Sequence, residues 1–233
     1  MTSERMQMTN LTNESAEYVA KREELRLAEL ELMQHQERVS ALRRSLPEGT
    51  PVEDYRFKEG PANLEAGDTP IRMVHLSELF SAPDRPLIIY HLMFGKLQKS
   101  PCPMCTAWMD ALNGVAIHLE QRADIAVVAA ADPAALRGHA RSRGWDNLRL
   151  LSAGGNTFKY DLGSEDREGH QDSTVSVFTL GSDGVPRHFY SAHPRMASDV
   201  KERGLDLLNP IWNYLDLTPG GRGDFYAKLN YTQ

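Results

Sequence analysis

The feature that most constrains the fold is a pair of cysteines between a predicted strand and a predicted helix. Cys102 and Cys105 are the only cysteines in 233 residues, and two residues separate them. The apolar run 86–94 before them is typical of a buried strand, and the stretch after them, through Leu119, is typical of a helix. Two thiols this close can form a disulfide with each other and reopen it. The pair is therefore suited to electron exchange and poorly suited to joining distant parts of a fold.

The remaining pattern predicts alternating strands and helices. Strands are expected over 52–57, 71–76, 124–131, 148–151, 175–180 and 186–190, and helices over 14–46, 76–80 and 133–143 and after Asn209. Gly181-Ser-Asp-Gly184 predicts a hairpin between the last two strands. This order predicts a mixed α/β sheet with helices on both faces, and a C-x-x-C at a strand-to-helix turn is typical of thioredoxin-like folds.

The predicted domain organisation has four parts. Residues 1–13 are expected to form a disordered tail, 14–49 a long helix, 50–222 the thioredoxin-like domain with a C-terminal helical extension, and 223–233 a second tail. Within the domain, the polar stretch 163–173 has no periodicity and is expected to be a mobile loop.

Composition excludes several classes of function. A net charge of −6 without a basic run argues against a general nucleic-acid-binding protein. The longest apolar runs fall far short of the roughly 20 residues that a membrane span requires, and the polar N-terminus lacks a signal-peptide core. We therefore expect a cytoplasmic protein, where a lone C-x-x-C is redox-active or metal-binding rather than structural. No cofactor is expected, because the glycines at 154–155 lack the context of a phosphate-binding loop.

The long N-terminal helix carries one continuous apolar row. Its members recur every seven residues at Tyr18, Leu25, Leu32, Val39 and Leu46. Lys21 and His35 interrupt the second row that a coiled coil needs. We expect the helix to pack on its own domain through this row, and the alternative is a homodimer formed through it.

The chemistry of the cysteine pair follows from its position at a helix start. With Cys102 as the N-cap, Pro103 occupies the first helical position, where proline is favoured. Cys105 is then the third helical residue, whose backbone N–H is directed at the capping side chain. This donor and the positive end of the helix dipole stabilise a thiolate, so we expect the Cys102 pKa to fall below the ordinary ~8.5. Cys102 is the predicted nucleophile, and Cys105 is the predicted resolving thiol.

Two neighbouring side chains are candidates for supporting roles. Trp108 belongs to an apolar helical row that is expected to face the core, together with Met104, Leu112, Val115 and Leu119. His91 ends the apolar strand before the cysteines. It is expected either to relay protons near the thiols or to be a hydrogen-bonded core residue.

Other uses of two cysteines remain open. A structural zinc site needs four ligands, so histidines would have to complete it, from among His91, His170, His188 and His193. Two thiolates and one histidine would suit a soft ion such as Cu(I). A third alternative is a thioredoxin-like module whose thiols are inert and which only binds a partner.

Several stretches resemble one bacterial thioredoxin-like family, catalogued as domain of unknown function 899. They are residues 90–95, 102–108, 113–114, 158–163, 204–209 and 213–219. The resemblance runs from the N-terminal helix to about Arg222 and implies a thioredoxin-like fold. It does not imply a reaction, because none is established for that family.

Two departures bear on the reaction. Thioredoxin-like folds usually carry a cis-proline before the strand that faces the C-x-x-C, but the segment containing Thr174 and Val175 has none. A cis bond there would cost about 2.5–4 kcal/mol, so we expect a trans bond and a changed substrate grip. The segment 71–80 resembles peroxiredoxins, which makes a thiol peroxidase the nearest enzymatic alternative. If Cys105 were the peroxidatic thiol, Cys102 would replace the usual threonine and Gln98 the usual proline.

Overall fold

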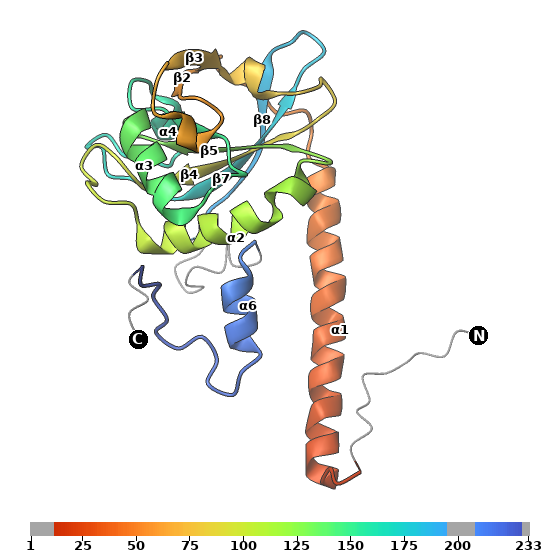
Figure 1. Ribbon diagram of the computed structural model, residues 1–233. Coiled ribbons are helices and arrows are strands. Elements are labelled where there is room, and N and C mark those ends of the chain that lie inside the picture. The colour runs from red at the N-terminus through yellow and green to blue at the C-terminus, as the bar shows by residue number, and fades with distance from the viewer. Residues whose placement is uncertain (1–11, 195–207, 230–233) are drawn as a thin grey trace. The chain divides into compact units, whose positions relative to one another are not determined.

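The computed structural model describes residues 12–194 and 208–229, and the chain divides into two compact units, residues 1–47 and 48–233. The first unit is the helix α1 (Ala16–Arg44), and the second contains a single sheet with its covering helices (Figure 1).

Helix α1 forms because its sequence has a strong start signal and nothing to break it. The Ser15 hydroxyl accepts a hydrogen bond from the Tyr18 N–H at 3.1 Å, and no glycine or proline follows until Pro47. The predicted helix over 14–46 is thus confirmed, with two residues fewer at each end. Taken by itself α1 buries no side chain, and Leu25, Leu32 and Leu42 are exposed.

The sheet has eight strands in the order β1-β8-β7-β4-β5-β6-β2-β3. Their bounds are β1 Thr50–Pro51, β2 Arg56–Glu59, β3 Arg72–His75, β4 Leu87–Leu92, β5 Asp124–Ala129, β6 Leu150–Ser152, β7 Thr174–Leu180 and β8 Pro186–Ala192. Strands β4, β5 and β6 are parallel to one another, while β7 pairs antiparallel with β4, and β8 pairs antiparallel with β7. The predicted mixed α/β, thioredoxin-like sheet is therefore confirmed.

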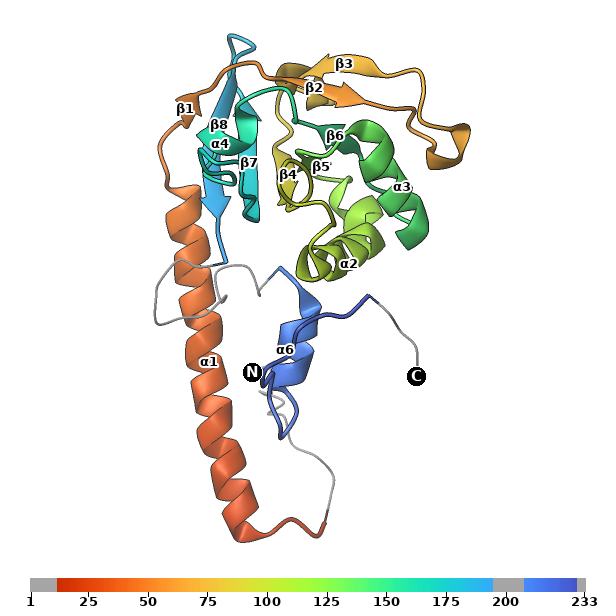
Figure 2. The same ribbon diagram turned by 90° about the vertical axis from the view of Figure 1, so that its left-hand side faces the viewer.

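Helices cover both faces of the sheet, and each face has its own core. The helical elements of this unit are η1 Leu64–Ala66, η2 Leu76–Leu79, α2 Pro103–Leu119, α3 Pro133–Arg143, α4 Phe158–Asp161 and α6 Pro210–Asp216. Residues of α2, α3 and α6 share one cluster with Tyr90 and Leu92 of the central strand, and Figure 2 shows α2 and α3 side by side. Residues of η2 and α4 share the other cluster with Ile89. The strand β4 is thus buried from both sides, as its apolar run predicts.

The face that α2 turns toward the sheet differs from the predicted row. Its buried residues are Cys105, Thr106, Trp108, Met109 and Ala116, whereas Val115 and Leu119 are exposed. The fully buried Ala116 lets the helix backbone approach the sheet closely. The sequence analysis placed the larger apolar side chains of Val115 and Leu119 on the core face instead of Ala116. The predicted row was therefore wrong in its C-terminal half.

The stretch 163–173 also differs from the mobile loop that was predicted. Glu165 pairs with Gln171 as a β-bridge, and the Asp172 N–H donates to the Ser164 carbonyl at 2.8 Å. The Asp166 N–H closes the turn on the His170 carbonyl at 3.1 Å. Short polar side chains and backbone groups hold this segment, and such bonds leave no hydrophobic period in a sequence.

Boundaries shift at both ends of the domain. The strand predicted over 52–57 is found as β1 and β2, because β1 pairs with β8 while β2 pairs with β3 and β6. Leu205, Leu208, Trp212 and Leu215 recur at the spacing of one helix face near the C-terminus. Of these, Trp212 is buried and Leu208 is exposed, while Leu205 lies outside the described residues. Among the described residues, none of the helices combines the length and apolarity that a membrane crossing needs.

Candidate active site

Cys102 occupies the N-cap of α2, directly after the chain leaves the central strand. Its backbone is extended (φ −63°, ψ 127°), and Pro103 takes the first helical position as predicted. The Cys102 N–H donates to the Met93 carbonyl at 3.1 Å, and its carbonyl accepts from the Thr106 N–H at 2.9 Å. These backbone bonds place the Cys102 sulfur at the start of the helix, where it is half-buried.

The two thiols interact with each other, and the interaction polarises the pair. The Cys105 S–H donates to the Cys102 sulfur, and this bond is the main reason that the Cys102 pKa falls to about 6. The N–H groups of Met104 and Cys105 also favour the thiolate, although no regular capping hydrogen bond to the Cys102 side chain is formed. The same bond to Cys102, together with burial, raises the pKa of Cys105 well above its ordinary value. The half-buried Cys102 is thus the ionised thiol, and Cys105, which is 3% exposed, remains protonated.

Tyr90 and Trp108 form the floor beneath the thiols. The Tyr90 hydroxyl hydrogen-bonds to both Cys105 and Ser173, and burial followed by the Cys105 charge raises the pKa of Tyr90 well above its ordinary value. The Tyr90 and Trp108 rings stack with centroids 5.8 Å apart. Trp108 is 9% exposed and contacts the site by stacking on Tyr90, so its role there is to pack against that ring.

A buried lysine lies behind the pair. Lys159 of α4 is 2% exposed, and its Nζ donates to the Leu92 carbonyl at 2.9 Å, at the end of β4. Burial lowers the pKa of Lys159 to about 8, against the opposing effect of neighbouring acidic groups, among which the Cys105 thiol is the largest when it ionises. A cation in this position favours the Cys105 thiolate, which is the form required to resolve a mixed disulfide.

His91 lies on the opposite face of the sheet from the thiols. Neighbouring residues of a strand point to opposite faces, so Tyr90 faces α2 while His91 stacks on Phe158 with ring centroids 5.0 Å apart. Its Nδ1 and Nε2 hydrogen-bond to Ser164 (2.6 Å) and Ser176 (3.0 Å). Burial lowers the pKa of His91 well below its ordinary value. This is the arrangement of a hydrogen-bonded core histidine, and the structure does not bring it to the cysteines.

Thr174 and Val175 begin β7 beside the site but point in different directions. Val175 pairs with Tyr90 and packs against the cluster that contains both cysteines and Trp108. Thr174 pairs with His91, is 2% exposed, and has a hydroxyl without a hydrogen-bond partner. The bond joining them is not among the cis peptide bonds of the described residues, so the trans expectation is confirmed.

The metal alternatives would need a third ligand near the two cysteines, which can be sought only in residues 12–194 and 208–229. Among the described residues, one group of three side chains is arranged to share an ion, namely Asp166, Glu168 and His170. All three are exposed, and neither cysteine belongs to the group.

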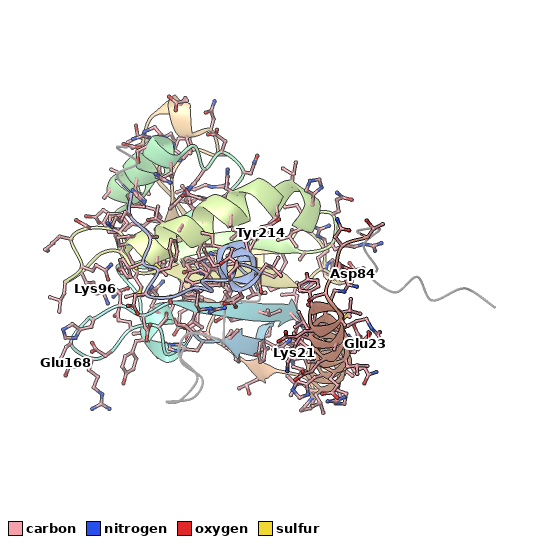
Figure 3. The ribbon with its side chains drawn as sticks, turned by 90° about the horizontal axis from the view of Figure 1, so that it is seen from below. Lys21, Glu23, Asp84, Lys96, Glu168 and Tyr214 are labelled. Carbon is pink, nitrogen blue, oxygen red and sulfur yellow. The ribbon has the colours of Figure 1, made fainter. Side chains whose placement is uncertain are left out.

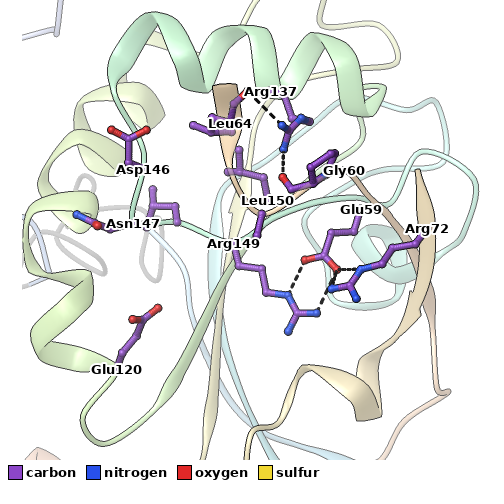
Figure 4. A pocket seen from close by; sticks show the side chains of 13 residues that line it. Glu59, Gly60, Leu64, Arg72, Glu120, Arg137, Asp146, Asn147, Arg149 and Leu150 are labelled. Atoms are coloured by element: carbon purple, nitrogen blue, oxygen red, sulfur yellow. Dashed lines mark hydrogen bonds and ion pairs between the residues drawn. The ribbon is translucent and has the colours of Figure 1, made fainter. Parts of the chain in front are cut away.

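The charged pocket shown in Figure 4 is separate from the cysteines. It has a volume of about 380 Å³, and Glu59 in its wall is paired with two arginines of the same wall. Glu59 accepts from Arg149 at 2.7 Å and from Arg72 at 2.9 Å, while Arg137 donates to loop carbonyls such as that of Asn63 at 3.0 Å. Arg137 thus holds the loop before β3, and the Glu59 carboxylate is already engaged by Arg72 and Arg149.

Sequence reasoning missed four residues of the site, namely Tyr90, Ser173, Lys159 and Tyr226. Tyr90 had a usable signal, because strand alternation places it on the face opposite His91. Ser173, Lys159 and Tyr226 gave none, since each lies far along the chain from the cysteines and reaches them only through the tertiary fold.

The comparisons with known proteins identify a family and a similar fold. The family model described as "Bacterial protein of unknown function (DUF899)" matches residues 7–232. A search of curated proteins found no match.

Among solved structures, the chain is similar to several peroxiredoxins. Reduced Prx3 from Vibrio vulnificus in complex with H₂O₂ is 14% identical with a TM-score of 0.48, over 70% of this chain and 99% of that one. Peroxidoxin BcpB from Mycobacterium tuberculosis is 17% identical with a TM-score of 0.46, over 71% and 98%. AhpC from the same organism is 14% identical with a TM-score of 0.45, over 70% and 94%. At these identities the likeness concerns the path of the chain alone. Because the family model spans nearly the whole sequence, this chain belongs to the bacterial DUF899 family of proteins of unknown function.

Proposed function

We propose that this protein is a thiol–disulfide oxidoreductase in which Cys102 attacks and Cys105 resolves. The observation that carries the proposal is the polarised pair: a half-buried Cys102 with a pKa of about 6 receives a hydrogen bond from the buried Cys105 thiol. A thiolate at neutral pH is the reactive form of cysteine, and C-x-x-C pairs at helix starts commonly reach this range.

The reaction proceeds in two displacements. The Cys102 thiolate attacks one sulfur of a substrate disulfide, a new S–S bond forms, and the substrate's other sulfur leaves and takes a proton. Cys105 then gives up its proton and attacks the Cys102 sulfur, which releases the second substrate thiol. The substrate disulfide gains two electrons and two protons, and the protein loses two electrons and retains a Cys102–Cys105 disulfide. Lys159 and the Tyr90 hydroxyl stabilise the Cys105 thiolate in the second step.

A peroxidase reaction is the second candidate, and it would have to use Cys102. Cys105 is 3% exposed and its pKa is raised, which is the opposite of what a peroxidatic thiol requires. The Cys102 thiolate would attack the terminal oxygen of a hydroperoxide, releasing an alcohol or water, and Cys105 would displace hydroxide from the resulting sulfenic acid to form the same disulfide.

Equilibration against glutathione redox buffers tests the leading proposal. Two thiols per chain should disappear in one two-electron transition, with a midpoint within about −270 to −120 mV, the span of related redox proteins. Cys102→Ser and Cys105→Ser are matched controls, and neither should form the intramolecular disulfide. A constant count of free thiols across all buffers would refute the oxidoreductase proposal, and rapid consumption of hydrogen peroxide by the reduced protein would favour the peroxidase.

A further inference from the structure

The C-terminal segment beyond α6 lies against the cysteine-bearing helix. The Trp212 ring of α6 is 6% exposed, and its centroid lies 6.4 Å from that of Trp108 in α2. The Phe225 ring meets Trp212 edge-on at 6.1 Å. Because Trp108 stacks on Tyr90, this aromatic contact links the C-terminal segment to the floor of the cysteine site.

After α6 the chain turns back toward the start of α2. Arg222 closes this turn by donating from Nε to Asp216 at 2.9 Å, and Figure 1 shows the dark blue segment returning to the beginning of α2. The Ala227 N–H donates to the Met104 Sδ at 3.0 Å, and Ala227 is 7% exposed although a free tail was expected here. Met104 stands between the two cysteines, so the C-terminal segment crosses directly over the motif.

Tyr226 is the residue of this segment that reaches the nucleophile. Its hydroxyl hydrogen-bonds to the Cys102 sulfur, while the ring as a whole is 58% exposed. The solvent side of Cys102 is therefore partly covered by a side chain from the far end of the sequence. Val175 packs against the cluster that also contains Cys102.

Because Tyr226 and Ala227 lie over one side of the motif, the size of a disulfide substrate affects its access to Cys102. To present its sulfur to Cys102, a disulfide within a folded protein must bring flanking polypeptide to both sides of the motif. One side is occupied by Tyr226 and Ala227, which hydrogen-bond to Cys102 and Met104. A small disulfide has no flanking polypeptide, so it can reach the Cys102 sulfur through a gap beside the Tyr226 ring.

We propose that Tyr226 is a specificity-determining residue that restricts Cys102 to low-molecular-weight disulfides and excludes protein disulfides. This inference rests on the proposed oxidoreductase function, and it names the substrate class of that same site. The bonds made and broken are those of the two displacements given above, with the small disulfide as the oxidant.

The test compares two substrates on reduced protein, namely oxidised 2-mercaptoethanol and the disulfides of insulin. Wild-type protein should react with the first and far more slowly with the second. Tyr226→Ala should raise the insulin rate relative to the small-disulfide rate by about tenfold or more, since specificity is a ratio of rate constants. Tyr226→Phe keeps the cover and removes one hydrogen bond to a charged group, so it should slow both reactions together by about 3- to 10-fold near pH 6.

Tyr214→Ala is the matched control. Tyr214 is a tyrosine of the same C-terminal segment, 70% exposed on α6 and labelled in Figure 3. It should leave both rates unchanged, and thermal melts should show all three variants folded, because Tyr226 and Tyr214 are both more than half exposed.

Three outcomes separate the two hypotheses. If wild-type protein reduces insulin as fast as the small disulfide, or if Tyr226→Ala leaves the ratio unchanged, the specificity role is refuted while the oxidoreductase function stands. If neither disulfide oxidises any variant, the proposed function is refuted and the specificity role with it. A gain of insulin reduction in Tyr226→Ala alone supports both.

Discussion

The polarised thiol pair makes a quantitative prediction about the reactivity of Cys102. The largest cause of its low pKa is the hydrogen bond from the Cys105 thiol, so the perturbation of choice is to change that donor. Cys105→Ala removes the donor, whereas Cys105→Ser keeps a hydroxyl donor of nearly the same shape.

The magnitude follows from the ionised fraction. With a pKa of about 6, Cys102 is about 90% thiolate at pH 7, against about 3% for an ordinary cysteine with a pKa near 8.5. Only the thiolate is alkylated, so Cys102 should react at pH 7 about 30-fold faster, at equal intrinsic nucleophilicity, than an ordinary thiol.

The assay is the rate of iodoacetamide alkylation between about pH 4 and pH 10, with the label located by mass spectrometry. In wild-type protein the rate should rise through an inflection near pH 6, and the label should be on Cys102. Cys105→Ala should shift the inflection upward, toward the ordinary range, and Cys105→Ser should shift it less. An inflection near pH 8.5 in the wild type, an unchanged profile in Cys105→Ala, or preferential labelling of Cys105 would each contradict the proposed polarity.

Three further predictions concern stability and assembly. The pKa of Lys159 falls from 10.5 to about 8 on folding. The buried charge therefore costs about 3 kcal/mol, a penalty that is full below pH 8 and fades as pH rises to 10.5. Lys159→Met should thus raise the free energy of unfolding in urea at pH 7 by about 2 kcal/mol, because the loss of one hydrogen bond offsets about 1 kcal/mol of the gain. Above pH 10.5 the charge penalty is gone, so the variant should be less stable than the wild type by about 1 kcal/mol. A loss of stability at pH 7 would contradict this. Trp212→Ala should lower the melting temperature, because truncating a buried tryptophan costs about 3 kcal/mol or more, and an unchanged melt would show that α6 is not docked. Deleting residues 1–46 should convert a dimer into a monomer in light scattering if α1 covers its apolar row with a second copy, and the same number of chains per particle before and after the deletion would refute the homodimer.

The sequence alone predicted those parts of the fold, such as helix starts and the central strand, that depend only on residues close together in the chain. Pro103 and Pro133 each favour a helix that begins at the proline, and α2 and α3 begin there. The apolar run before Cys102 specifies a strand buried on both faces, which β4 is. Each of these signals acts over three or four residues of backbone, so it survives without any knowledge of the rest of the chain.

Only the tertiary structure decided what surrounds the thiols. His91 and Tyr90 are adjacent in sequence, but the pairing of β4 within the sheet sends one to Phe158 and the other to Cys105. The contact between Ala227 and Met104 joins residues 123 positions apart, and Lys159 reaches the end of β4 from 67 positions away. Such contacts have no periodic signature, because they depend on which elements pack together and at what distance. The sequence thus predicts a reactive cysteine pair, and the packing of remote segments buries Cys105, places the Tyr90 hydroxyl beside it and brings Tyr226 to Cys102.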